Sequence, residues 1–313
     1  MSPAGPDAGV RVPARRATGL PSNWFDGHPV AWLGVLPAVL FIGPFLLYVT
    51  AFLFLPSLRL LQQAFSDADG RPTLHYVASL TEEQTVSAFL NSIVLSALSA
   101  LVGVLFGGLA AAALLRRGMP RVVRSLVTTF SAVAANFAGV PLAFAFIGTL
   151  GSLGLVTTWL KQRGVDIYAL GFSLYSLPGL VLVYSYFQIP LMMIVITPAI
   201  EALRREWREA ADNLGASPWQ YWRMIGLPVL LPSLLSAYIL LFGNAFSAYA
   251  TPYALTAGAL ALVPISISNV LSGNVMLAPQ AGAALAVGMI VVMTLVMCVY
   301  VPTMRLVNRW TQR

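Results

Sequence analysis

The stretch PAIEALRREWREAADNLGASPWQYWRMIGLP, residues 198–228, is a charged interruption between two long apolar runs. Pro198 suits a first helical turn. The apolar residues after it recur at helical spacing and predict one amphipathic helix: Ile200, Leu203, Trp207, Ala210 or Ala211, and Leu214. The opposite face carries opposite charges four residues apart, which support a helix: Glu201 with Arg205, Arg205 with Glu209, and Arg208 with Asp212.

A turn and a second short helix are predicted within the same stretch. Gly215 follows the apolar stripe, where a left-handed cap would end the first helix. Ser217 and Pro218 resemble an N-cap and a first-turn proline. Pro228 marks the entry to the next apolar run. We therefore interpret residues 198–228 as a helix–turn–helix elbow at a membrane surface.

The sequence on either side of the elbow is long and apolar. Of the 313 residues, 58% are hydrophobic and only 9% are charged, and the mean hydropathy is +0.80. A soluble domain has about 25% charged residues, so the bilayer is the expected solvent. Since a membrane helix needs about 20 apolar residues, we predict an all-α polytopic protein with six transmembrane helices: Ala31–Leu55, Ala88–Leu115, Ser125–Leu150, Leu174–Ile200, Val229–Leu255 and Ala281–Val301.

Two regions are not assigned to a span. Residues 1–29 are rich in Pro, Gly, Ala and Arg and are predicted to be a disordered cytoplasmic tail, which leaves 30–313 as the transmembrane domain. Residues 256–280 contain glycine and proline turn signals. This connection could be a loop, a segment that dips into the membrane, or a short interfacial helix, and the sequence does not choose between them.

The basic residues predict the orientation of the spans. Most of the 18 lysine and arginine residues precede span one, follow span six, or lie between spans two and three or four and five: Arg11, Arg15, Arg16, Arg116, Arg117, Arg121, Arg124, Arg204, Arg205, Arg208, Arg223, Arg305, Arg309 and Arg313. By the positive-inside rule, both termini and the elbow are expected on the cytoplasmic side.

The absence of charged residues from the predicted spans, and of clustered metal-ligating residues from the sequence, disfavours several classes of protein. No charged or histidine residue lies within any of the six predicted spans, whereas a proton-driven transporter typically places a titrating group there. His28 and His75 have no neighbour at metal-ligand spacing, and Cys298 is the single cysteine. The basic residues flank apolar runs instead of clustering on a folded face, so nucleic acid is not an expected partner. A membrane-embedded enzyme is therefore disfavoured, and no catalytic or metal-binding residue is predicted.

Polar uncharged residues within the spans are candidates for lining a solute path: Asn136, Gln188, Asn244, Ser247, Tyr249 and Thr251. Gly243-Asn244 and Thr251-Pro252 could weaken the fifth helix and expose backbone carbonyls to a cavity. The alternative is that these side chains only bond one membrane helix to another, as Asn, Gln and Ser often do.

The elbow resembles a known motif. Glu209-Ala210-Ala211, Gly215, Ile225 and Leu227-Pro228 have the residue types and spacing of the EAA loop of binding-protein-dependent ABC import permeases. The elbow's place between spans four and five also fits type I importers of this family.

This resemblance implies a fold, partners and roles. The fold would be that of a type I ABC importer permease in the bacterial plasma (inner) membrane. The partners would be a cytoplasmic ABC ATPase dimer, a second permease subunit (identical or paralogous), an extracytoplasmic solute-binding protein and membrane lipid. Glu209, Ala210, Ala211, Gly215, Ile225, Leu227 and Pro228 would form the coupling helix that docks on the ATPase. The chain has no G-x-x-x-x-G-K-[ST] phosphate loop, so ATP and Mg²⁺ would bind the separate ATPase and this chain would carry no cofactor.

A second resemblance concerns the solute. Residues 242–258, FGNAFSAYATPYALTAG, resemble span five of permeases in the polyamine (spermidine/putrescine) branch. This implies a polyamine or a similar small organic or ionic nutrient, although branches for iron, thiamine, sulfate or phosphonates remain open. A stand-alone secondary transporter or channel is the alternative function.

Overall fold

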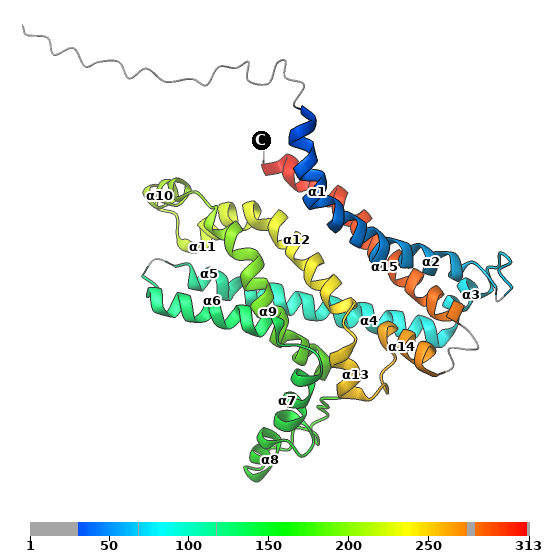
Figure 1. The fold of residues 1–313 in the computed structure, drawn as a ribbon. Helices are drawn as coiled ribbons and strands as arrows, with labels where there is room; N and C mark the ends of the chain where they lie inside the picture. Colours follow the sequence, from blue (N-terminus) through cyan, green and yellow to red (C-terminus); the bar gives the residue numbers. More distant parts are fainter. Residues whose placement is uncertain (1–30, 68, 117, 274–278, 312–313) are drawn as a thin grey trace, which may run out of the picture. The chain divides into compact units, whose positions relative to one another are not determined.

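The computed structural model describes residues 31–311, except 68, 117 and 274–278. The predicted tail at 1–29 lies outside the described residues. In the part of the chain that the structure describes, helices form almost all of the regular structure, and one isolated β-bridge joins Ser66 and Pro72 (Figure 1). The all-α prediction is confirmed.

Two compact units divide the chain, Met1–Ser57 and Leu58–Arg313. The first unit contains α1 (Ala31–Val49), the π-helical turn η1 (Thr50–Phe54) and the start of α2 (Leu55–Ala64). These helices follow one another without a break, although the sequence from Ala31 to Ala64 includes glycine and proline residues. Leu40–Ala64 is long and apolar enough to cross a membrane.

The second unit carries the remaining helices, which are α3 (His75–Ala78), η2 (Ser79–Thr81), α4 (Glu83–Val102), η3 (Gly103–Gly107), α5 (Gly108–Leu114), α6 (Arg121–Asn136), α7 (Val140–Leu150), α8 (Leu155–Gln162), α9 (Leu177–Glu201), α10 (Arg205–Asn213), α11 (Pro218–Tyr221), η4 (Trp222–Gly226), α12 (Leu227–Phe246), α13 (Ala250–Thr256), α14 (Val263–Gly273) and α15 (Pro279–Thr311). α4, η3 and α5 form one continuous rod, and so do α11, η4 and α12.

Six helical segments of the described chain are long and apolar enough to span a membrane, as predicted: Leu40–Ala64, Glu83–Leu114, Val140–Gln162, Leu177–Glu201, Pro218–Phe246 and Pro279–Pro302. Two predicted boundaries are wrong. The third span, expected as one helix over 125–150, is divided into α6 and α7 at residues 137–139. The fifth, expected over 229–255, is divided into α12 and α13 at residues 247–249.

α9 is the centre of the second unit. It packs against α4, α5, α6 and α12, and many of its residues are buried, including Val183, Tyr184, Gln188 and Met192. The close approach of η3 and α5 to α9 depends on glycine. A Cβ added at Gly107 would lie 2.6 Å from both the Ile189 carbonyl oxygen and the Met192 Cβ. Small residues commonly permit such approach between membrane helices.

The connection between the last two spans folds back onto the bundle. The Val263 amide donates to the Ser92 hydroxyl at 2.9 Å, and the Asn91 side chain donates to the Ala261 carbonyl at 3.2 Å. α14 then packs against α4 and α15. Ser92 lies nine residues into α4, which is about 14 Å along that helix. The described part of this connection contains a short helix, α14, that packs on the bundle; its depth in the membrane stays a prediction.

Candidate functional site

The elbow between α9 and α12 consists of two short helices joined by a tight turn. α10 ends in a Schellman motif, in which the Gly215 amide donates to the Asp212 carbonyl at 3.0 Å and the Ala216 amide donates to the Ala211 carbonyl at 2.9 Å. Gly215 has a φ of +73°, the left-handed conformation that glycine adopts without steric cost. The predicted glycine cap is confirmed.

The second helix of the elbow starts with a capping box. The Ser217 amide donates to the Gln220 side chain at 2.7 Å, and the Gln220 amide donates to the Ser217 hydroxyl at 3.3 Å. Pro218 occupies the first turn, where its missing N–H costs nothing. α11 therefore begins where the sequence predicts.

Arg208 fixes the two helices of the elbow to each other. Its guanidinium lies 3.6 Å from the Asp212 carboxylate, one turn along α10, and 4.9 Å from the centre of the Tyr221 ring on α11. Tyr221 is buried, so this ring is a fixed platform for the cation. The turn, the capping box and Arg208 together set the angle between α10 and α11.

The outer surface of the elbow exposes large apolar side chains, unlike the mostly polar surface of a soluble protein. Leu214 is 87% exposed, Trp219 72% and Met224 74%. Beside them is a groove of about 520 Å³, lined by Trp207, Ala210, Ala211, Leu214, Ala216, Gln220, Tyr221, Met224, Ile225 and Val229. Exposed apolar side chains gathered at one place mark an interaction surface.

The seven predicted coupling residues all lie on this elbow. Five of them are exposed: Glu209, Ala210, Gly215, Leu227 and Pro228. Ile225 is half-buried, and Ala211 is the buried residue of α10. The structure therefore brings the motif residues together on one short segment. Their role in coupling stays a prediction.

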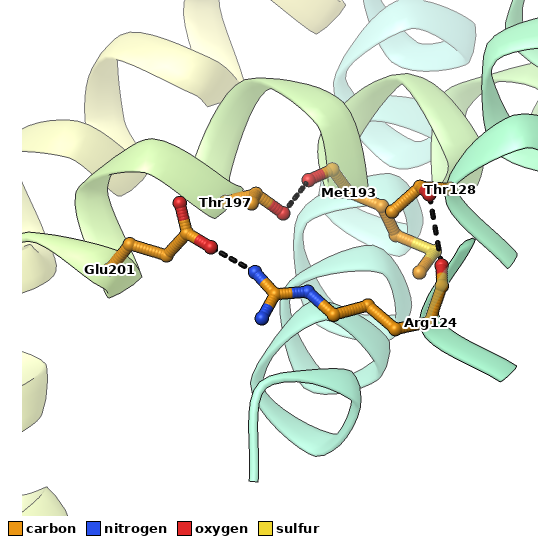
Figure 2. A network of polar contacts seen from close by, with 5 residues as sticks. All are labelled: Arg124, Thr128, Met193, Thr197 and Glu201. Carbon is orange, nitrogen blue, oxygen red and sulfur yellow. Dashed lines mark hydrogen bonds and ion pairs between the residues drawn. The ribbon is translucent and has the colours of Figure 1, made fainter. Parts of the chain in front are cut away.

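The start of the elbow differs from the prediction. α9 continues through Pro198 to Glu201, and a bend at residues 202–204 precedes α10. Ile200 and Leu203 therefore do not share a helix with Trp207. Because of the bend, Glu201 forms its ion pair with Arg124 of α6 and not with Arg205 (Figure 2).

Figure 2 shows the surroundings of this ion pair, where two threonine hydroxyls form hydrogen bonds within their own helices. The Thr197 hydroxyl donates to the Met193 carbonyl on α9, and the Thr128 hydroxyl donates to the Arg124 carbonyl on α6. One turn further, the buried Ser131 hydroxyl contacts the Met193 sulfur at 3.6 Å. The elbow thus begins at the end of α9 to which α6 is bound.

The predicted path residues do not behave alike. Gln188 is 0% exposed and donates to the Leu241 carbonyl on α12 at 2.9 Å, so it bonds two helices inside the bundle. Asn136, Asn244 and Ser247 are exposed, and each belongs to the end of α6 or α12, next to a helix break. Tyr249 lies in the break itself and accepts a hydrogen bond from Ser268 at 2.9 Å.

Thr251 joins the two helix breaks. Its hydroxyl accepts from the Gly139 amide at 2.8 Å and donates to the Gly139 carbonyl at 3.4 Å. Gly139 has φ +79° and ψ −149°, a region that is essentially restricted to glycine. Sequence reasoning missed Gly139, although Gly139 and Pro141 together are a local signal for ending one helix and starting another.

The fold and the elbow define a class of protein. It is a multi-pass membrane subunit in which two spanning helices are connected by an exposed helical elbow of fixed conformation. Among the described residues no group of His, Cys, Asp and Glu could hold a metal ion. Residues 103–311 match the profile of the binding-protein-dependent transport system inner membrane component, and the chain belongs to this family. It is therefore a multi-pass inner-membrane permease of the ABC importer class, a transport component.

Individual relatives are more distant. The chain is 26% identical over 206 residues to a probable sulfate transport system permease protein (cysT) of Nephroselmis olivacea, covering 65% of this chain and 68% of that protein. It is 28% identical over 175 residues to the molybdenum transport system permease protein ModB of Mycobacterium tuberculosis, covering 55% of this chain and 62% of that one. These names give no support to the polyamine branch.

The same fold occurs in a solved structure. The chain aligns with a TM-score of 0.70 and 22% identity to a permease chain from a bacterial ABC transporter involved in the import of the acidic polysaccharide alginate, covering 88% of this chain and 96% of that one. The predicted type I importer permease fold is confirmed.

Proposed function

We propose that this permease forms half of a solute path and that its elbow, residues 198–228, docks on a separate cytoplasmic ATPase. The observation that carries the proposal is the exposed apolar surface of Leu214, Trp219 and Met224 on an elbow whose angle is fixed by local hydrogen bonds. A preset shape lowers the conformational entropy lost on docking. Such a segment suits the transmission of a movement, because it can shift as one piece.

The remaining partners follow from the same proposal. Two permease subunits, two ATPase subunits and an extracytoplasmic solute-binding protein make up the importer. ATP and Mg²⁺ bind to the ATPase, since this chain has no phosphate loop. The ATPase supplies the energy, and this chain supplies the path.

The solute that we propose is an anion or an uncharged nutrient. In the spanning helices that the structure describes, acidic residues occur only at helix ends, as Glu83 and Glu201. A cation crossing these helices would meet no compensating charge. The sulfate and molybdenum relatives and the trehalose transport system permease protein SugB of Mycobacterium tuberculosis, 27% identical over 184 residues, agree with this charge argument.

The test is co-purification of the permease with its genomically adjacent ATPase, followed by ATP hydrolysis in liposomes with the binding protein. We expect Gly215→Asp and Glu209→Lys to lose assembly or stimulation. Gly164→Asp is the matched control for the glycine, because Gly164 is also exposed, has a φ of +86° and lies in the loop after α8. Glu82→Lys, an exposed residue before α4, is the control for the glutamate.

Two outcomes would contradict the proposal. If the controls lose assembly as much as the elbow variants do, the elbow is not the docking surface. If the wild-type permease purifies alone and moves solute without ATP, a stand-alone secondary transporter or channel explains the chain better.

A further inference from the structure

In the second unit, α6 and α12 end beside each other, and each is followed by another helix after a short break. α6 ends at Asn136 and α7 begins at Val140, while α12 ends at Phe246 and α13 begins at Ala250. α6 has 16 residues and is about 24 Å long. Its break is therefore separated from the elbow end of the bundle by most of the thickness of a bilayer core.

The segments beyond the two breaks are attached to each other. Thr251, at the start of α13, is 3% exposed and bonds both backbone groups of Gly139, immediately before α7. A Cβ at Gly139 would lie 3.7 Å from the Ala250 Cβ, so the two breaks are in van der Waals contact. α7 and α13 also pack along their lengths.

The segments before the two breaks are attached to α9 instead. α6 is held by the Arg124–Glu201 ion pair near its start and by the contact of the buried Ser131 hydroxyl with the Met193 sulfur at 3.6 Å. α12 is held by the buried hydrogen bond from Gln188 to the Leu241 carbonyl. α6, α9 and α12 therefore form one body that begins at the elbow.

Among the described residues, the contact between α7 and α9 includes no side-chain hydrogen bond or ion pair, whereas α6 and α12 each have a polar contact with α9. Leu142 and Ala143 of α7 belong to an apolar cluster with α9, and Phe146 meets Tyr186 edge-on at 6.0 Å. Apolar contacts are non-directional and allow one surface to slide on another. The two hydrogen bonds of Thr251 have defined directions and do not permit sliding.

We propose that Thr251 is a positioning residue for transport, which links the two helix breaks into one hinge. When the importer changes state, α7 and α13 move as one outer body against α6, α9 and α12. This inference rests on the proposed function, because the elbow delivers the movement that the hinge redirects. Without the link, each break bends on its own and the movement of α6 is not passed to α13.

The hinge can be tested with pairs of spin labels on the permease in which Cys298, its single cysteine, is replaced by serine. One pair, at Phe144 on α7 and Tyr253 on α13, lies within the outer body. The second pair, at Val133 on α6 and Phe144, crosses a break. All three side chains are exposed, at 64%, 42% and 64% for Phe144, Tyr253 and Val133, so labels fit there.

In the assembled importer, we expect the distance across the break to change between the nucleotide-free and ATP-vanadate states while the distance within the outer body stays constant. Thr251→Val should broaden the distance distribution within the outer body, and it should lower the amount of solute imported per ATP hydrolysed. Thr251→Ser keeps the hydroxyl and should restore both readings. Thr256→Val is the matched control, since Thr256 is also buried on α13 but bonds only to Pro252 of its own helix.

The outcomes separate this inference from the proposed function. The broadening caused by Thr251→Val is measured on the permease alone and needs no ATPase. If the variant shows wild-type distances there, or if Thr256→Val broadens them equally, the link is refuted. If the link holds but the wild-type permease does not assemble with the ATPase, it is the proposed function that fails. A distance across the break that stays constant during transport would refute the hinge.

Discussion

Gly107→Ala should loosen the centre of the bundle, because η3 and α9 leave no room for a side chain there. The added Cβ would lie 2.6 Å from the Ile189 carbonyl oxygen and from the Met192 Cβ, whereas ordinary contact begins at 3.4 Å. The two helices would have to separate by about 0.8 Å locally, the difference between these two distances. Both contacted groups belong to the backbone or the first side-chain atom of α9, so neither can rotate away.

The magnitude follows from two opposing effects. Overpacking a close contact costs about 1–3 kcal/mol. Replacing glycine by alanine inside a helix contributes about 0.5–1 kcal/mol in the opposite direction. We therefore expect Gly107→Ala to destabilise the permease by about 1–2 kcal/mol, which lowers the unfolding temperature by about 2–4 °C per kcal/mol for domains of comparable size.

Gly108→Ala is the control for this experiment. The nearest atom to its added Cβ is the terminal methyl carbon of Met192 at 3.8 Å, an ordinary contact with a flexible side chain. This neighbouring variant should be neutral or more stable than the wild type. Thermal unfolding in detergent, followed by tryptophan fluorescence, measures both variants. An unfolding temperature of Gly107→Ala at or above that of Gly108→Ala would refute the steric argument.

Three further predictions concern the elbow and the ends of the bundle. Gly215→Ala should weaken assembly with the ATPase more than Gly215→Asn, as judged by co-purified ATPase, because a left-handed backbone costs alanine about 1–2 kcal/mol and asparagine less. A double-mutant cycle of Arg124→Gln and Glu201→Gln should give a coupling below about 1 kcal/mol in thermal unfolding, since the side chains are 45% and 48% exposed; a coupling several times larger would contradict surface screening. The Asp166 carboxylate accepts a hydrogen bond from Lys161, which lowers its pKa below the ordinary value of 3.8. The ion pair between Asp166 and Lys161 therefore stabilises the loop after α8 fully above pH 3.8, and this stabilisation is lost as the pH falls through the lowered pKa of Asp166. Proteolysis of this loop should increase only in strong acid. Asp166→Asn should be cleaved faster than the wild type at pH 7.

The elbow could be predicted because its conformation depends on neighbouring residues. Gly215 ends α10, and Ser217 with Pro218 starts α11, through hydrogen bonds that span no more than five residues. The continuation of α9 through Pro198 was not predicted. α9 carries both Pro190 and Pro198 inside one continuous helix, and Pro198 is exposed, so the local preference of proline for a first turn did not determine where the helix begins.

The first helix break was not predicted, although one local signal was present. The second was expected only as a weakening of the fifth helix at Gly243-Asn244 and Thr251-Pro252, and it falls between these two signals. An apolar run of sufficient length indicates a span and gives no information about a change of direction inside it. Gly139 and Pro141 could have suggested the first break. Its position beside the second break could not be predicted, because the bond from Gly139 to Thr251 joins residues 112 positions apart.

Gln188 and Thr251 show why a polar residue in an apolar span is ambiguous in sequence. Both side chains are buried, and both bond backbone groups outside their own helix. Gln188 bonds the carbonyl of Leu241, within the unbroken helix α12, so it joins two continuous helices. Thr251 bonds a glycine whose backbone belongs to no helix, so it determines how two separate segments are joined. The two residues differ in whether the backbone group that they bond lies inside a helix or in a break between helices. A polar residue that bonds a helix break is therefore the stronger candidate for controlling a conformational change.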